Sequence, residues 1–128
     1  MNMKVSPYLY FNGNCTEAIA FYEKAFNVKA EVIHEGTENL VSHGEFEIGG
    51  YSIFLCDTIQ PMPPVTIGDN TMIAIRFNES EKTVIQSAFD TLKEDGNLIM
   101  ELEETSWSKC FGLLIDKFGV KWNMCQSL

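Results

Sequence analysis

The sequence is built from two copies of one unit. The segment Tyr8–Glu35 has the pattern strand, capped helix, strand, and Ala74–Glu101 has the same pattern. Phe11 and Asn12 recur as Phe77 and Asn78, an offset of 66 residues. Each half then closes with a glycine turn and a further strand. Two copies of one supersecondary unit restrict the chain to folds in which equivalent modules are joined. A cleft on their symmetry axis is the first place to look for a site.

Hydrophobic periodicity predicts the same elements in both halves. In the first half, strands are expected at Tyr8–Asn12, Ala30–His34, Leu40–Ile48 and Tyr51–Cys56, with a helix from Asn14 to Phe26. In the second half, strands are expected at Met72–Phe77, Leu98–Leu102, Cys110–Ile115 and Val120–Cys125, with a helix from Asn78 to Lys93. Asn14 with Glu17, and Asn78 with Glu81, have the spacing of a capping box.

These elements predict an α+β fold. Two βαβββ modules, at about residues 1–60 and 65–128, form a curved eight-stranded mixed sheet around a cleft. The proline-rich residues 61–64 link them. A chain of 128 residues is expected to form a single domain over 1–128.

Charge and cysteine content restrict the class of partner. The net charge of −9 argues against nucleic acid or an anionic membrane as partner, because both attract basic surfaces. The chain has no apolar run of transmembrane length, and its first residues lack a signal-peptide core. The four cysteines, Cys15, Cys56, Cys110 and Cys125, have no zinc-type or paired spacing. We therefore expect a cytoplasmic protein with reduced thiols.

The sequence resembles the vicinal-oxygen-chelate superfamily, which includes glyoxalase I, bleomycin- and fosfomycin-resistance proteins and extradiol dioxygenases. The resemblance lies in Tyr8–Gly13 and in Glu17–Phe26. The stretches Trp107-Ser108 and Asp116–Trp122 are closer to the branch called PhnB-like or 3-demethylubiquinone methyltransferase-like. The chain has none of the GxGxxG, P-loop, GxSxG or HExxH motifs, and nothing in it matches a nucleotide-type cradle, so we do not expect methyl transfer.

The resemblance implies where metal ligands would lie in a metal-dependent member. The first-strand positions fall at Pro7 and Met72, and the fourth-strand positions fall at Phe54 and Asn123. Pro and Phe cannot ligate a metal, Met is too soft for Fe(II) or Mn(II), and Asn is a poor neutral ligand. We expect no metal and no cofactor.

Strand alternation suggests which residues face the cleft. If Phe54 points inward, so do Ser52 and Cys56, and a tight turn at Gly49-Gly50 places Glu47, Glu45 and His43 opposite them. In the second half, Asn123 inward implies Lys121 and Cys125 inward, opposite Leu114, Gly112 and Cys110. A register change of one residue would invert that set.

The chemistry of these residues suggests roles, each with a structural alternative. His43 is the best candidate for a general base, with Glu45 to orient it, although both are also compatible with a solvated strand face. Arg76 could hold an anionic ligand, or it could pair internally with Glu45 or Glu47. Trp107 and Phe111 could wall the cleft, whereas Trp122 is expected in the core. Cys110 and Cys125 could be a reactive pair or packing residues.

Three functions are compatible with this pattern. In the first, a metal-free protein binds a small, partly apolar ligand through Phe54, Arg76, Trp107, Cys110 and Asn123. In the second, His43 with Glu45 acts as a general base on a small anionic substrate. In the third, the cleft is vestigial and the protein is structural. We also expect a homodimer, because the open sheets leave edges to cover and two-fold symmetry is the commonest assembly.

Overall fold

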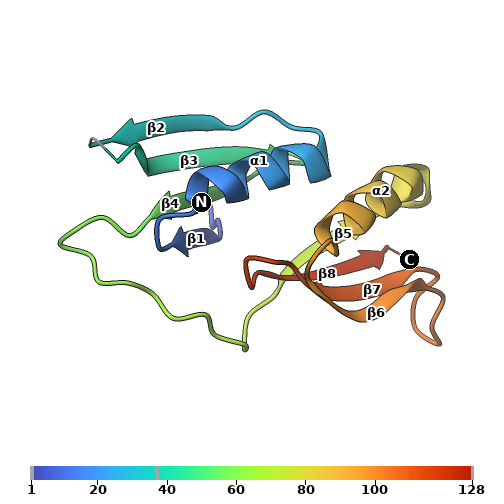
Figure 1. The fold of residues 1–128 in the computed structure, drawn as a ribbon. Helices are drawn as coiled ribbons and strands as arrows, with labels where there is room; N and C mark the ends of the chain where they lie inside the picture. Colours follow the sequence, from blue (N-terminus) through green and yellow to red (C-terminus); the bar gives the residue numbers. More distant parts are fainter. Residues whose placement is uncertain (1, 37, 128) are drawn as a thin grey trace. The chain divides into compact units, whose positions relative to one another are not determined.

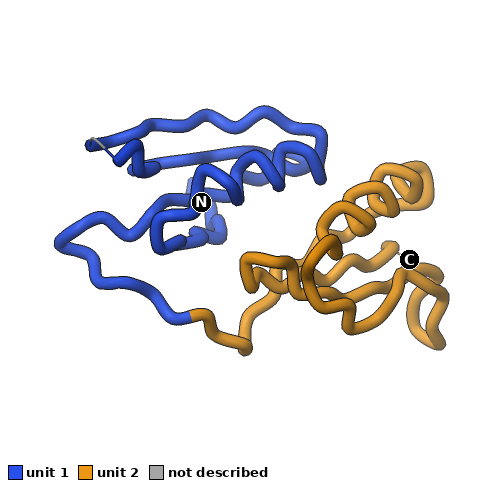
Figure 2. The backbone as a smooth tube through the Cα atoms, viewed as in Figure 1, with its two compact units in different colours: residues 1–66 blue, residues 67–128 orange. Residues whose placement is uncertain are grey.

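The computed structural model describes residues 2–36 and 38–127. The chain divides into two compact units, residues 1–66 and residues 67–128, which Figure 2 shows in blue and orange. Each unit contains one four-stranded mixed sheet and one α-helix (Figure 1). The two predicted βαβββ modules are therefore present, and each is described below by itself.

The first unit contains β1 (Tyr8–Phe11), α1 (Cys15–Phe26), β2 (Glu31–Glu35), β3 (Leu40–Ile48) and β4 (Tyr51–Asp57). The strand order is β1-β4-β3-β2. The pair β1–β4 is parallel, and the other pairs are antiparallel. The β3–β4 hairpin turns at Gly49 and Gly50, both with positive φ, which glycine adopts at little steric cost.

The second unit repeats this topology. It contains β5 (Ile73–Phe77), the 3₁₀-helix η1 (Glu79–Glu81), α2 (Lys82–Leu92), β6 (Asn97–Glu103), β7 (Phe111–Ile115) and β8 (Lys121–Gln126). The strand order is β5-β8-β7-β6, with β5–β8 parallel. The predicted capping box is confirmed here: Ser80 N donates to Asn78 Oδ1, and Asn78 N donates to Glu81 Oε1.

In the first unit, α1 covers one face of the sheet. The Phe46 ring lies 5.9 Å from Tyr22 and 6.2 Å from Phe26, measured between ring centroids, and is 2% exposed. Ile53 and Leu55 on β4 are buried on the same side. Because side chains alternate along a strand, the neighbours of these residues must point to the opposite face of the sheet.

A buried carboxylate, Asp57, holds the start of α1 against this sheet. Asp57 Oδ1 accepts hydrogen bonds from Gly13 N and Cys15 N, and Oδ2 accepts one from Val41 N. The predicted Asn14 cap is wrong, because the Asn14 side chain makes no capping bond. The orphan N–H groups of the helix start are satisfied by a residue far along the chain instead.

In the second unit, a second buried carboxylate closes the turn between β7 and β8. Asp116 Oδ1 accepts from Phe118 N and Val120 N, and Oδ2 accepts from Trp122 Nε1 at 2.9 Å. The predicted core position of Trp122 is confirmed, since the residue is 0% exposed. Gly112 lies under α2, where a Cβ would come within 2.8 Å of the Phe89 ring. Only glycine allows the helix to approach this closely.

The register predicted for the second sheet is wrong by one residue. Leu113 pairs with Asn123, Phe111 with Cys125 and Ile115 with Lys121. The sequence analysis had expected Gly112 opposite Asn123, Cys110 opposite Cys125 and Leu114 opposite Lys121. Leu114 is 0% exposed and therefore lies on the buried face of the sheet. The turn that Asp116 organises is one residue longer than the expected hairpin, so every residue of β7 changes face.

Among the residues that the structure describes, no helix is long and apolar enough to cross a membrane.

Candidate functional site

The face of the first sheet that points away from α1 carries the candidate site. Phe46 and Leu55 pack toward α1, so Glu45, Glu47 and Phe54 lie on the opposite face, called here the open face. Glu45 pairs with Phe54 and Glu47 pairs with Ser52, as the sequence predicted. The parallel strand β1 adds Tyr8 beside Phe54 and Tyr10 beside Cys56.

Aromatic rings form the centre of this open face. Tyr8 stacks on Tyr10 with ring centroids 4.8 Å apart and planes 13° apart. The Tyr8 ring also lies 5.6 Å from the Phe54 ring. Tyr8 is 38% exposed and Tyr10 40%, although the two rings stack on each other. The three rings therefore offer an accessible apolar surface for stacking.

A line of polar groups runs beside these rings. The Tyr8 hydroxyl lies 3.1 Å from His43 Nδ1, and His43 Nε2 lies 3.5 Å from Glu45 Oε1. Ser52 Oγ donates to Glu45 Oε2 at 3.3 Å. The His43 ring contacts Phe54 at 5.4 Å. The structure therefore brings together His43, Glu45 and Phe54, which the sequence analysis had placed on one face.

The contacts of His43 select one tautomer. A carboxylate only accepts hydrogen bonds, so the proton of neutral His43 belongs on Nε2, toward Glu45. Nδ1 is then an acceptor for the Tyr8 hydroxyl. Burial, together with a hydrogen bond to Cys56, raises the pKa of Tyr8 to about 12, so this hydroxyl stays protonated and donates at neutral pH.

Sequence reasoning missed Tyr8 and Tyr10 as site residues. The resemblance placed the first-strand ligand position at Pro7, whereas the structure pairs Tyr8 with Phe54, and Phe54 N donates to Pro7 O. A difference of one position moves the tyrosines onto the open face. The signal was present in the alternation of tyrosine with Leu9 and Phe11, both apolar, along a single strand.

The second sheet has an open face of different chemistry. Arg76 pairs with Cys125, and Cys125 pairs with Phe111 across three adjacent strands. Trp107 lies against Phe111 in a T-shaped contact at 5.6 Å. Arg76 is exposed, and it has no ion-pair partner within 4.0 Å among the described residues.

Cys110 does not share this face. The residue is 4% exposed, and Phe111 takes the place opposite Cys125 that the sequence analysis gave to Cys110. Burial raises the pKa of the Cys110 thiol. The thiols of Cys110 and Cys125 are both free, and the corrected register places Cys110 on the α2 side of the strand.

The inferred ligand positions of metal-dependent relatives do not suit a metal. Phe54 lies among aromatic rings, and Asn123 pairs with Ala74 on one side and with Leu113 on the other. Neither side chain is a carboxylate or an imidazole, the groups that Fe(II) and Mn(II) prefer, and His43 and Glu45 beside Phe54 are only two such groups. Within residues 2–36 and 38–127, no group of three or more His, Cys, Asp or Glu side chains could hold a metal ion.

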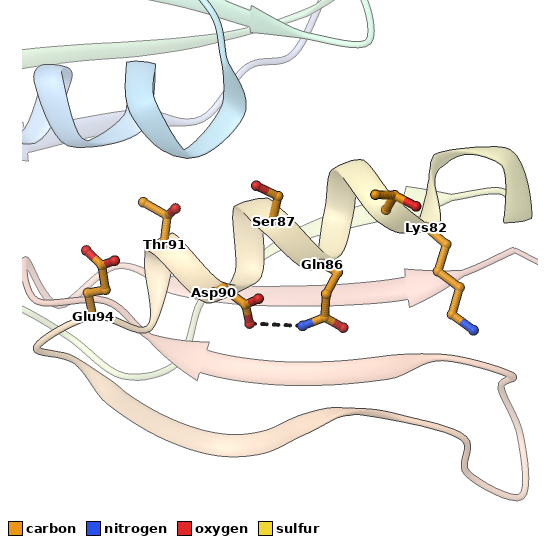
Figure 3. Close-up of a pocket in the computed structure, with 7 residues that line it drawn as sticks. Lys82, Gln86, Ser87, Asp90, Thr91 and Glu94 are labelled. Carbon is orange, nitrogen blue, oxygen red and sulfur yellow. Dashed lines mark hydrogen bonds between the residues drawn. The ribbon is translucent and has the colours of Figure 1, made fainter.

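A separate hollow of about 610 Å³ follows the outer side of α2 (Figure 3). Its lining residues all come from this helix and its C-terminal end: Lys82, Thr83, Gln86, Ser87, Asp90, Thr91 and Glu94. Gln86 Nε2 donates to Asp90 Oδ1 within the hollow. Polar side chains of one helix lack the convergent apolar walls of a small-molecule site. We therefore regard the aromatic open face of the first sheet as the better candidate.

Comparison with solved structures identifies the class. The structure of PA1353 from Pseudomonas aeruginosa matches with a TM-score of 0.84 and 26% identity over 98% of both chains. A protein titled putative 3-demethylubiquinone-9 3-methyltransferase, PhnB protein, from Bacillus cereus matches with a TM-score of 0.75 and 27% identity, over 98% of this chain and 100% of that one. The fosfomycin resistance protein FosX from Listeria monocytogenes shares the fold at a TM-score of 0.63 and 14% identity, over 100% of this chain and 93% of that one. The protein thus has the glyoxalase/bleomycin-resistance fold of the vicinal-oxygen-chelate superfamily.

The sequence also places the chain in a particular family. Residues 3–125 match the family described as 3-demethylubiquinone-9 3-methyltransferase, and the chain belongs to it. Protein YjdN of Escherichia coli is 28% identical over 94% of this chain and 92% of its own length. The PhnB-like assignment made from the sequence is therefore confirmed.

Proposed function

We propose that this protein binds a small, partly apolar ligand on the open face of its first sheet. The observation that carries the proposal is the exposed stack of Tyr8 on Tyr10, next to Phe54. Close-packed aromatic rings left accessible on a sheet face are a common basis for ligand recognition. The adjacent hydroxyl, imidazole and carboxylate groups supply the few polar contacts that orient a ligand.

The first prediction concerns this aromatic surface. We expect quinoline, a neutral aromatic probe at about pH 8, to bind wild-type protein, and binding to weaken at least tenfold in Tyr8→Ala/Tyr10→Ala. Each aromatic contact that the variant loses contributes about 0.5–1.5 kcal/mol to the binding free energy beyond the effect of its buried area. Isothermal titration calorimetry measures the dissociation constants. Tyr51→Ala is the matched control, because Tyr51 is 79% exposed and pairs with Ile48 at the β3–β4 turn. Equal loss in both variants would contradict the proposal.

A second candidate function is general-base catalysis, which the contacts of His43 favour. Glu45 can stabilise the imidazolium that forms when Nδ1 gains a proton. Because Nδ1 already faces the Tyr8 hydroxyl, the substrate proton would pass to the Tyr8 oxygen as the Tyr8 proton passes to Nδ1. The high pKa of Tyr8 excludes a free tyrosinate near neutral pH, so the two transfers must be concerted.

Deuterium exchange tests this second function. Phenylpyruvate is a small, partly apolar anion with acidic C3 protons, and NMR follows their exchange in D₂O. We expect wild-type protein to accelerate the exchange, and His43→Gln to lose about 100-fold of the acceleration, the usual contribution of one general base. His34→Gln is the control, because that imidazole lies on β2 against Asn39 O. Identical rates for wild type and His43→Gln would exclude the base.

Two further properties belong to the proposal. The protein is proposed to act without a metal, because Pro7, Phe54, Met72 and Asn123 do not offer a suitable ligand set. The homodimer stays a prediction, supported by the edge strands β2 and β6 and by the exposed apolar residues Ile33, Leu98 and Ile99 on them.

A further inference from the structure

We infer that the open face of the first sheet selects cationic aromatic ligands. The inference rests on the proposed function and specifies its ligand class. The starting observation is the charge of the face. Glu45 and Glu47 lie on it, and β2 adds Glu31, which pairs directly with Glu45. None of the four strands of this sheet contains a lysine or an arginine.

Within the described residues of this unit, these carboxylates have no lysine or arginine partner. Among the described residues, Glu31 and Glu47 take part in none of the ion pairs within 4.0 Å, and both are exposed. Among the described residues, the ion pair that Glu45 makes is with His43. Like charges directly opposite each other on adjacent strands destabilise a sheet. The pairing of Glu31 with Glu45 therefore has a cost that no lysine or arginine of these four strands relieves.

The internal repeat shows that the fold does not require this chemistry. Tyr8 pairs with Phe54 as Ala74 pairs with Asn123, and Glu45 pairs with Phe54 as Leu113 pairs with Asn123. The second module forms the same sheet with neither the aromatic rings nor the carboxylates at these positions. The combination of rings and carboxylates is therefore a property of the first module's surface rather than of βαβββ topology.

Charge complementarity identifies the occupant. A carboxylate lies about 7 Å from the next one on β3, because alternate residues of a strand have that spacing. Glu45 lies two strands from Tyr8 on the open face, with Phe54 between them, and Glu31 and Glu47 are its neighbours on the same face. A planar aromatic cation can stack on the rings, gain cation–π attraction and approach the carboxylates together. An aromatic anion stacks on the same rings but is repelled by these carboxylates, so it binds more weakly than the cation.

Three probes of similar size test the inference by calorimetry at about pH 8: N-methylquinolinium, neutral quinoline and quinoline-2-carboxylate. We expect N-methylquinolinium to bind about tenfold more tightly than quinoline, and the carboxylate to bind more weakly than either. In Glu31→Gln/Glu47→Gln, the preference for the cation should fall about fivefold, while quinoline binding stays unchanged. Raising the salt concentration should weaken binding of the cation, strengthen binding of the repelled carboxylate and leave quinoline binding unchanged.

The control removes the same charge elsewhere. Glu94→Gln/Glu104→Gln changes the net charge equally, in the second unit, and should keep the full preference. A carboxylate probe that binds as tightly as the cation would overturn the inference. The proposed function would survive that outcome if Tyr8→Ala/Tyr10→Ala still weakened the binding of all three probes. Failure of all three probes to bind at about 5 mM would overturn both.

Discussion

Replacing Asp57 with alanine is expected to lower the free energy of unfolding by about 3–5 kcal/mol. Asp57 is 3% exposed and accepts hydrogen bonds from three backbone N–H groups, at Gly13, Cys15 and Val41. Without the carboxylate, these donors lose their partner in the interior, and each buried unsatisfied group costs about 1–3 kcal/mol. Urea denaturation followed by circular dichroism measures the change.

Two variants define the cause of this loss. Asp57→Asn keeps one acceptor oxygen for Gly13 and Cys15 but presents an N–H group to Val41 N. Its free energy of unfolding should therefore lie between those of wild type and Asp57→Ala. Asp69→Ala, at an exposed loop position, should change stability by no more than about 0.5 kcal/mol. A loss below about 1 kcal/mol in Asp57→Ala would show that water or relaxed backbone replaces the carboxylate.

The elements and the modular fold were predictable because they depend on local patterns. The 66-residue repeat and the alternation of apolar residues predicted all eight strands and both α-helices. The Asn78 capping box was predictable for the same reason, since its partners lie within three residues. The helix start at Asn14 was not, because Asp57 makes its capping contacts from a distant strand.

The second open face was mispredicted because turn geometry depends on side-chain contacts. Asp116 binds Phe118 N and Val120 N and so lengthens the turn before β8. Because side chains alternate between the two faces of a strand, the one additional turn residue places Phe111, and not Cys110, on the open face. Sequence patterns alone do not determine which turn forms, because both faces of β7 carry apolar residues.

The first open face was predicted in part. A two-residue glycine turn fixes the β3–β4 register, so the pairing of Glu45 with Phe54 followed from the sequence. The register of the parallel pair β1–β4 has no short turn to fix it, because α1, β2 and β3 lie between these strands in the chain. Tyr8 and Tyr10, which complete the aromatic surface, were therefore missed.

The second large effect is expected at alkaline pH and arises from Cys15. This thiol is 0% exposed, and burial, followed by the nearby charge of Asp57, raises its pKa from 9.0 to about 12. The unfolded chain ionises the thiol near pH 9, whereas the folded protein keeps it neutral up to about pH 12. The native state therefore has its full stability below pH 9 and loses it progressively as the pH rises toward 12.

Cys15→Ala separates this contribution from other alkaline effects. Three pKa units correspond to about 4 kcal/mol, so wild type should lose up to that much more stability than the variant between pH 9 and pH 12. At pH 7 the variant should be the less stable protein, by about 1–2 kcal/mol, because it leaves a small cavity beside Asp57. The two stability curves are therefore expected to cross. Urea denaturation with reductant at pH 7, 9, 10 and 11 tests this, and parallel curves would show that the Cys15 thiol ionises alike in the folded and unfolded chains.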